Sequence, residues 1–577
     1  MISKEVDNNK LRVLAAAFII IAAAIIVRLF YLQILQHEYY SAFALNTHEI
    51  YKQLHPRRGE ILFQDTRTKT EYPAAVNRDF FTIFAVPKEI PPEFAASTTE
   101  KLSQYFQWTD TDKQNITQKL LKTDDQYEPM AKKVDDVTAE KIKNEQIKGI
   151  YSSPQEYRYY PEKNISSAVL GFSRLNDAGT EQIGNYGIEG YWNKALAGQK
   201  GFLLGERGAL GNIIALGDST KKNAEDGADI VLTIDRTIQL KACSVLKDGM
   251  TKYGAGGGAL VLMNPKTGAI LAMCNVPDYD PNKYSEVKDA STFTNSAIVE
   301  SYEPGSVFKP FTMAAGIDLG LISPNTTFTD PCQREINGFT LRNAEQKCYG
   351  LQTMTQVLEN SINTGVIFVA EKVGREKFEQ YVKKFGFGEK TGIELSSEAN
   401  GDVSSLGKNG LIYVATASYG QGIMTTPLQL ATAYSAIANG GKLVKPFVIS
   451  EVRYSNGKKE TTEPQIVENA ISERTSKLVS GMLVSVVEKH YKAAKIPGYY
   501  VAGKTGTAQV AEKGKYLESK TNHTFVGYAP ATAPELVLVV KYENPQRAWA
   551  ESTALPVFQE IMDFTLNYYG IKGDKKI

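Results

Sequence analysis

The first residues that could do chemistry are a serine and a lysine three positions apart. In "YEPGSVFKPFT", Pro304 and Gly305 break the chain and Ser306 opens a helical pattern, so Ser306 and Lys309 lie one turn apart on one face. Serine is a weak nucleophile that needs a base. No histidine lies nearer in sequence than His490. The pair therefore suits covalent acyl transfer with lysine as the base, although an isolated pair of this kind is more often a helix cap and a solvated lysine.

A second candidate is the tripeptide Lys-Thr-Gly, which occurs three times. Lys266 begins a copy in an Asn-Pro turn between two apolar, strand-like runs, and Lys390 begins one just after a helical pattern that ends at glycines. We interpret these two copies as connectors. The third copy lies in "VAGKTGTAQV", a strand-like run stripped to small side chains. So little bulk suits a place where a ligand or another backbone approaches closely.

This third copy predicts a binding edge. A period of two puts Thr505 and Thr507 on one face of the strand and Lys504 on the other, with Gly506 between the threonines. Such an edge could pair with an extended peptide while the hydroxyls hold its terminal carboxylate. Lys504 would also supply a cation near Lys309, and a desolvated lysine beside a second cation can lose its proton near neutral pH.

A third group stands in "LENSINTGVIF", a polar interruption between two helical runs. Ser361 could relay a proton to a leaving amine, and Asn363 could hold a substrate amide. This motif is very weak alone. The three groups together, S-x-x-K, S-x-N and K-T-G in this order, resemble the motif set of penicillin-binding proteins and class A β-lactamases.

The resemblance is to class B penicillin-binding proteins and covers nearly the whole chain. From about Gly227 onward, "ASYGQGIMTTPLQLATAYSAIANGGKLVKP", "FVGYAP" and "ALPVFQEIM" resemble their transpeptidase domain. Upstream, "LFYLQIL", "RRGEI", "YPEKNISSAVLGF" and "YGIEGYWNKALAG" resemble their anchor and pedestal. Two departures are Ile362 at the centre of the second motif and "QDTRTKT" where the family usually has D-R-N-G.

What the resemblance implies is acyl transfer on peptidoglycan stem peptides that end in D-Ala-D-Ala. Ser306 would attack the carbonyl between the two D-alanines, Lys309 would take its proton, and Ser361 would protonate the leaving D-Ala. The two threonines would bind the terminal carboxylate, Lys504 would set the local potential, and the backbone N–H groups of Ser306 and Thr507 would form the oxyanion hole. An amine from a neighbouring stem would close the crosslink, and β-lactams would acylate the same serine. No cofactor or metal is implied.

These residues need a multidomain α+β scaffold. We expect a cytoplasmic tail at residues 1–12, a single transmembrane helix at 13–35, an extended mixed α/β pedestal or dimerisation domain at 36–226, and a transpeptidase domain at 227–577. The last domain would hold an antiparallel sheet flanked by helices. The expected location is a bacterial cytoplasmic membrane, with the catalytic domain outside and a membrane glycan polymerase as partner.

The expected anchor rests on an apolar run. Val13–Val27 is apolar without a break, three basic residues precede it, and after Arg28 no Lys or Arg follows until Lys52. The "AFA" at Ala42–Ala44 has the form of a signal-peptide cleavage site but lies well past the apolar core. A buried core helix is a third interpretation, which the lack of a polar face disfavours.

Composition excludes other classes. Lys and Arg number 65 and Asp and Glu 64, so the net charge of +1 gives no electrostatic case for nucleic acid. The four cysteines form no C-x-x-C pair, which argues against a structural zinc site. Cys332 and Cys348 bracket a polar insertion, where a disulfide and two free thiols are both open. Cys243 and Cys274 sit in apolar runs, and we expect buried packing residues.

Two other functions use the same residues. A membrane-anchored D,D-carboxypeptidase or a β-lactamase would hydrolyse the acyl-enzyme, but a secreted β-lactamase needs neither pedestal nor anchor. A non-catalytic penicillin sensor would usually carry a cytoplasmic signalling domain, and few residues precede the expected anchor. Within the family, the short extracytoplasmic region favours the division type over the elongation type.

Overall fold

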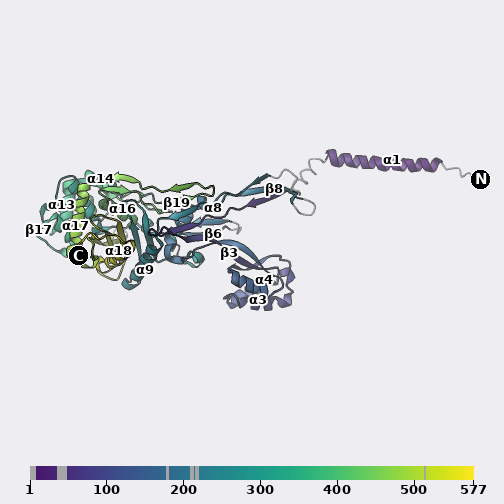
Figure 1. The fold of residues 1–577 in the computed structure, drawn as a ribbon, viewed down its shortest axis with the longest axis horizontal. Helices are drawn as coiled ribbons and strands as arrows, with labels where there is room; N and C mark the ends of the chain where they lie inside the picture. The colour runs from purple at the N-terminus through teal and green to yellow at the C-terminus, as the bar shows by residue number, and fades with distance from the viewer. Residues whose placement is uncertain are drawn as a thin grey trace, which may run out of the picture. The chain divides into compact units, whose positions relative to one another are not determined.

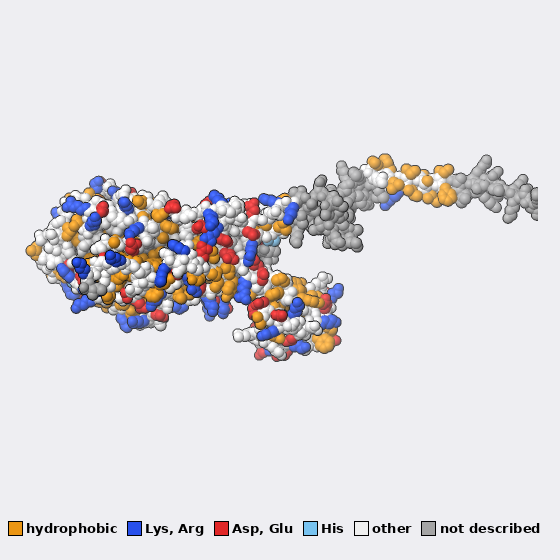
Figure 2. All heavy atoms as spheres, in the orientation of Figure 1, with side chains coloured by type: hydrophobic (Ala, Val, Ile, Leu, Met, Phe, Trp, Pro, Cys, Tyr) orange, Lys and Arg blue, Asp and Glu red, His pale blue; other side chains and the backbone are white. Residues whose placement is uncertain are grey.

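The structure is a computed structural model that describes residues 8–35, 49–176, 181–207, 213–214, 220–512 and 515–576. The chain divides into two compact units. The smaller comprises Met1–Arg57 and Gly198–Asp226, and the larger comprises Arg58–Ala197 and Gly227–Ile577. The Ala42–Ala44 motif and the first seven residues of the expected tail lie outside the described residues. The larger unit mixes helices and sheets, and Figure 2 shows basic and acidic side chains interspersed over its visible face.

The smaller unit contains helix α1, Asn8–Phe30, which continues as a π-helix over Tyr31–Leu35. The apolar run predicted as an anchor lies in α1, and hydrophobic side chains predominate on the coloured part of this helix in Figure 2. Among the described residues, no helix reaches the length and apolarity that a membrane crossing needs. Strand β8, Gly201–Arg207, pairs with β1, Glu49–Leu54, and with β10, Thr220–Lys222.

A sheet of seven strands in the larger unit joins both halves of the sequence. Its order is β20-β19-β11-β2-β3-β4, and β5 pairs with the long strand β3 outside this order. The strands are β2 (Ile61–Gln64), β3 (Glu71–Ala85), β4 (Glu128–Val134), β5 (Ile150–Tyr159), β11 (Asp229–Leu232), β19 (Ile449–Arg453) and β20 (Lys459–Thr461). Helices α3 (Ala95–Ser103) and α4 (Asp110–Leu120) lie beside the far end of β3 (Figure 1). The pedestal is therefore continuous with strands that come after residue 227.

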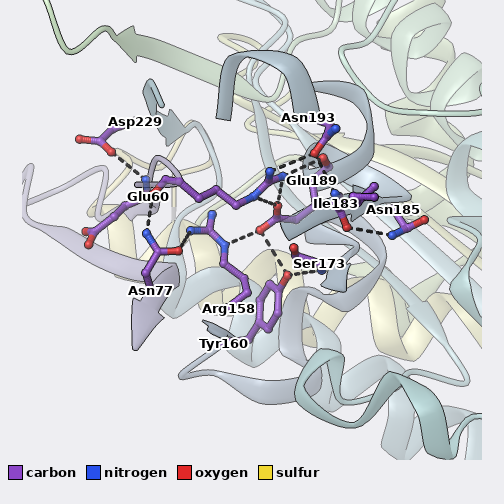
Figure 3. A network of polar contacts seen from close by, with 12 residues as sticks. Glu60, Asn77, Arg158, Tyr160, Ser173, Ile183, Asn185, Glu189, Asn193 and Asp229 are labelled. Atoms are coloured by element: carbon purple, nitrogen blue, oxygen red, sulfur yellow. Dashed lines mark hydrogen bonds and ion pairs between the residues drawn. The ribbon is translucent and has the colours of Figure 1, made fainter. Parts of the chain in front are cut away.

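A buried ionic cluster stabilises this region (Figure 3). Glu189 lies between two guanidinium groups, with Arg58 Nε 2.8 Å from Oε2 and Arg158 Nε 2.6 Å from Oε1. Tyr160 donates to the same carboxylate at 3.2 Å, and Arg158 donates to the Asn77 side chain at 3.2 Å. Burial would raise the pKa of Glu189, but the two guanidiniums hold it below its ordinary value. The stretches "RRGEI" and "YGIEGYWNKALAG", which contain Arg58 and Glu189, thus supply two of the three charges.

The second sheet carries the predicted binding edge. Its antiparallel order is β13-β12-β24-β23-β22, where β13 is Ile270–Val276, β12 Gly257–Met263, β24 Leu536–Glu543, β23 Lys515–Ala529 and β22 Ala502–Glu512. Helices α9 (Arg236–Tyr253) and α18 (Ala554–Tyr569) pack together on this sheet, and α11 (Lys309–Asp318), α16 (Pro427–Ala438) and α17 (Glu473–His490) form a second group. The expected antiparallel sheet flanked by helices is confirmed.

The other sequence predictions for this region fare unevenly. The copy that begins at Lys266 lies in the turn between β12 and β13, and the copy at Lys390 follows helix α14, Arg375–Lys384, so both are connectors as predicted. A disulfide joins Cys332 and Cys348. A second disulfide joins Cys243 and Cys274, a pairing that the expectation of buried packing residues did not include. Helix α9 packs on β13 and brings these two cysteines together, although they are 31 positions apart in sequence.

Candidate active site

Ser306 lies in a tight turn rather than at the start of an α-helix. It is the second residue of the 3₁₀ helix η7, Gly305–Phe308, and α11 begins at Lys309. The alternative in which Ser306 caps an α-helix therefore does not hold. Ser306 and Lys309 still share a face, because side chains at i and i+3 are eclipsed in a 3₁₀ helix. Gly305 adopts a left-handed φ of 60° and donates its N–H to the Gly420 carbonyl at 3.0 Å. This glycine sets the turn that precedes the serine.

Lys309 is brought to the second motif. Its side chain is fully buried, and Nζ lies 2.9 Å from Ser361 Oγ and also donates to the Ser361 carbonyl. Ser361 sits between α12, Met354–Glu359, and α13, Asn363–Val373, as the sequence predicts. Its φ of 55° is in the left-handed region, which is uncommon for a residue with a side chain and is typical of functional sites.

The environment of Lys309 favours the neutral amine. Burial lowers its pKa well below the usual lysine range, and the positive charge of Lys504 lowers it further. The sequence predicted both causes. A lysine that gives up its proton at a lower pH than usual can accept one from a hydroxyl.

The small side chains of strand β22 have a structural reason. β22 is the edge strand of its sheet, and Gly506 faces the serine turn. A Cβ on Gly506 would lie 2.8 Å from the Pro304 carbonyl oxygen and 3.0 Å from Val307 Cγ1. The serine turn therefore rests directly on the Lys-Thr-Gly backbone. The predicted close approach of another backbone is confirmed.

Lys504 and Thr505 meet at one hydroxyl that sequence reasoning missed. Lys504 is fully buried, and its Nζ donates to the Tyr491 hydroxyl at 3.0 Å. The same hydroxyl is 2.7 Å from Thr505 Oγ1. The backbone alternation predicted that Lys504 and Thr505 would face apart, but the long lysine side chain bends back to the shared partner. Tyr491 follows α17 directly, outside every motif, so no sequence signal marked it.

The remaining predicted residues have partners elsewhere. Thr505 Oγ1 also donates to Glu551 Oε1 at 3.2 Å, and Thr507 Oγ1 accepts from the Ala550 backbone at 3.2 Å. Asn363 donates its side-chain amide to the Arg342 carbonyl at 2.8 Å. Within the described chain, Asn363 thus bonds to the hairpin between the two cysteines and not to a predicted site residue.

Large hollows lie away from these residues. One of about 980 Å³ is lined by α16, α17 and neighbouring loops, and one of about 770 Å³ lies between β4, β5 and the segment around Lys283. Neither is lined by a predicted site residue. The motif residues and their contacts, and not either of these hollows, therefore define the candidate site.

Comparison with known proteins assigns the chain to a family. Residues 258–563 match the sequence model of the penicillin binding protein transpeptidase domain, and residues 53–232 match that of the penicillin-binding protein dimerisation domain. The chain therefore belongs to the class B penicillin-binding proteins. It is 34% identical over 566 residues to stage V sporulation protein D of Bacillus subtilis, covering 96% of this chain and 85% of that protein. It is 32% identical to a probable peptidoglycan D,D-transpeptidase, PbpC, of Pseudomonas aeruginosa, covering 74% and 73%.

Solved structures share the fold. A peptidoglycan synthetase from Bifidobacterium adolescentis superposes with a TM-score of 0.71 at 25% identity, covering 92% of this chain and 98% of that one. Penicillin binding protein 3 from Mycobacterium tuberculosis, solved in complex with aztreonam, gives a TM-score of 0.69 at 24% identity, covering 91% and 98%.

Proposed function

We propose that this chain is a serine-type peptidoglycan D,D-transpeptidase whose nucleophile is Ser306. The observation that carries the proposal is Lys309, a fully buried lysine with a lowered pKa, one 3₁₀ turn after the serine and 2.9 Å from Ser361 Oγ. The names of the relatives support the same reaction. The donor is a stem peptide that ends in D-Ala-D-Ala.

Acylation follows from the roles of these groups. Ser306 Oγ attacks the carbonyl carbon between the two D-alanines while neutral Lys309 takes the hydroxyl proton. Ser361 bridges Lys309 to the leaving nitrogen, so the proton passes to D-Ala as the C–N bond breaks. Donors for the oxyanion are the backbone N–H groups of Ser306 and Thr507, each expected to contribute about 3–4 kcal/mol. An amine from a second stem then attacks the ester, closes the crosslink and frees Ser306.

Binding uses the edge strand. The substrate peptide extends along β22, and its terminal carboxylate accepts from the hydroxyls of Thr505 and Thr507 under the positive potential of Lys504. Gly506 keeps the strand close to the serine turn. Asn363 donates one amide N–H to the Arg342 carbonyl, and its second N–H and its Oδ1 are the groups that would meet the substrate amide. β-Lactams present a reactive amide and a carboxylate to the same groups and acylate Ser306.

Labelling with a fluorescent penicillin tests the nucleophile. The wild-type chain should be labelled, Ser306→Ala should not, and the neighbouring Ser301→Ala should behave as wild type. Equal labelling of the first two proteins, or none of either, refutes the assignment. A label that persists for hours supports a transpeptidase, whereas rapid turnover of penicillin supports a hydrolase.

We also propose the division into residues 1–12, 13–35, 36–226 and 227–577, with 13–35 as anchor in a bacterial cytoplasmic membrane. The apolar run of α1 and the basic residues before it support an inside N-terminus. A membrane glycan polymerase is the expected partner. Protease added outside spheroplasts should digest the catalytic domain, and alkaline carbonate should leave the chain with the membrane. Release of the intact chain by carbonate contradicts the anchor.

A further inference from the structure

Four side chains form one directed series of hydrogen bonds at the binding edge. Lys504 Nζ lies 3.0 Å from the Tyr491 hydroxyl, which lies 2.7 Å from Thr505 Oγ1, which lies 3.2 Å from Glu551 Oε1. An ammonium can only donate and an ionised carboxylate can only accept. The direction is therefore fixed: lysine donates to tyrosine, tyrosine to threonine, and threonine to Glu551.

In this series Thr505 donates its only hydroxyl proton to Glu551. The residue is 5% exposed, so few other groups can reach it. The substrate's terminal carboxylate is proposed above to accept from this same hydroxyl. A hydroxyl cannot donate its one proton fully to two carboxylates, and two such charges at one donor repel each other.

The position of Glu551 in the chain keeps its carboxylate beside Thr505. It belongs to the short helix η11, Ala550–Ser552, whose first backbone N–H donates to Thr507 Oγ1. Both threonine hydroxyls thus contact one segment. Glu551 is solvent-exposed, and within the part of the chain that the structure describes no ion pair engages it. Its charge therefore acts on the binding edge through the hydrogen bond to Thr505.

We infer that Glu551 is a specificity-determining residue that occupies the place of the terminal carboxylate and disfavours anionic acyl donors. The inference rests on the proposed function, because it assigns a competitor to the proposed carboxylate site. A donor with a carboxylate has to displace Glu551 from Thr505, whereas a neutral donor does not. The effect falls on binding of the donor, so it raises KM and leaves kcat nearly unchanged.

The test measures second-order rate constants for acylation of the full-length chain by two probes. One is benzylpenicillin, which carries a carboxylate, and the other is its neutral methyl ester. Glu551→Gln removes the charge and keeps an oxygen that accepts from Thr505. We expect the rate constant with benzylpenicillin to rise about five- to tenfold at low salt and that with the ester to stay unchanged, because only the carboxylate meets a like charge.

Matched controls separate charge from structure. Glu560→Gln removes an exposed carboxylate of α18, one that pairs with Lys241, and should move neither rate constant. Glu551→Ala, which removes both charge and acceptor, should also raise the rate with benzylpenicillin. Thermal melts of all variants check folding.

The outcomes are distinct. If neither probe acylates Ser306 in the wild type, the proposed function fails and the inference falls with it. If both probes acylate the wild type but Glu551→Gln leaves the benzylpenicillin rate unchanged or lower, only the inference is overturned. An equal rise with both probes also overturns it, because that result reports a change in the serine's environment rather than in carboxylate selection.

Discussion

Two groups of buried charges lie in the larger unit and differ in one respect. In the pedestal, the Glu189 carboxylate is bonded by the guanidiniums of Arg58 and Arg158, and all three side chains are at most 4% exposed. In the proposed active site, Lys309 and Lys504 are equally buried, but among the described residues their hydrogen-bond acceptors are neutral oxygens. The first group is neutralised in part by opposite charge, and the second is not.

The difference teaches what buried charge is used for. Removing charges from water is costly in both places. Where an opposite charge is present, each group stays ionised and the network ties together segments that are far apart in sequence. Where it is absent, the cost is relieved by loss of a proton, and a lysine becomes a base. The same desolvation penalty is thus offset by opposite charge in the pedestal, and in the proposed function it prepares Lys309 to take the proton of Ser306.

The largest expected effect comes from removing the base. Lys309→Met should lower the rate constant of acylation by penicillin about 10²–10⁴-fold, because Ser306 loses the group that takes its proton. The stability of the chain should not fall, since an unneutralised buried amine is replaced by an apolar side chain of similar length. Stopped-flow acylation and urea unfolding measure the two quantities. Acylation within tenfold of wild type would remove Lys309 from the base role.

Removing the charge of Glu189 should have the opposite pattern of effects: stability falls and acylation stays the same. Glu189→Gln leaves two buried guanidiniums without a counter-charge and should lower the free energy of unfolding by about 3–5 kcal/mol. Acylation per folded molecule should be unchanged. The loss can be followed by urea unfolding, with Glu473→Gln in an exposed ion pair as a control that should cost less than about 0.5 kcal/mol.

Glu189 should also make the free energy of unfolding sensitive to acid. The pKa of Glu189 is lowered on folding, so its contribution is fully present above the ordinary value of 4.5 and is lost as pH falls through the folded value. Glu189→Gln should therefore flatten the acid limb of the unfolding midpoint plotted against pH. An acid limb as steep in the variant as in wild type would contradict this origin.

A smaller change comes from removing the second cation. In Lys504→Met the pKa of Lys309 should rise because one repulsion is gone, but burial, the larger cause, remains. The acid limb of the pH dependence of acylation should move to higher pH without reaching 10.5. Lys541→Met is the matched control, because this buried lysine pairs with Glu300 and Glu543. A limb that stays in place in Lys504→Met would show that the two lysines are not coupled.

The smallest expected effect belongs to Tyr491→Phe. The ring that lies 5.6 Å from Lys504 Nζ is kept, while the hydroxyl that joins Lys504 to Thr505 is lost. One hydrogen bond is worth about 0.5–1.5 kcal/mol, so acylation should slow about two- to tenfold. Tyr568→Phe, which removes a hydroxyl bonded to Asp65 instead of to the site residues, should leave acylation unchanged. A loss beyond a hundredfold would mean that the phenol takes part in the chemistry.

Much of the candidate site could be predicted from the sequence, but less of its surroundings could. Ser306, Lys309 and Lys504 could be grouped because each stands in a short motif whose neighbours explain it. Tyr491 and Glu551 could not, since their contacts arise only when α17 and η11 pack around β22. Spacing within a motif is local information, whereas the partners of a motif depend on tertiary packing.

The same reason explains the misses in the fold. Arg58 and Glu189 meet across 131 positions, and neither the composition nor the periodicity of their segments indicates a partner at that separation. Cys243 and Cys274 have the apolar neighbours of ordinary core residues, so their pairing depended on how α9 lies on β13. The antiparallel sheet and the two connector copies of Lys-Thr-Gly were accessible, because strand runs and turns are local patterns.

The contact of Gly506 with the serine turn has a consequence for biosynthesis. The turn around Ser306 rests on a strand that is made about 200 residues later, and β22 is itself held in the sheet through β23 and β24. A ribosome that has completed Ser306, the proposed nucleophile, has therefore not yet made the strand that this turn contacts. Penicillin reactivity should appear only after Glu543, the last residue of β24, has emerged, so nascent chains arrested earlier should carry Ser306 in an unreactive form.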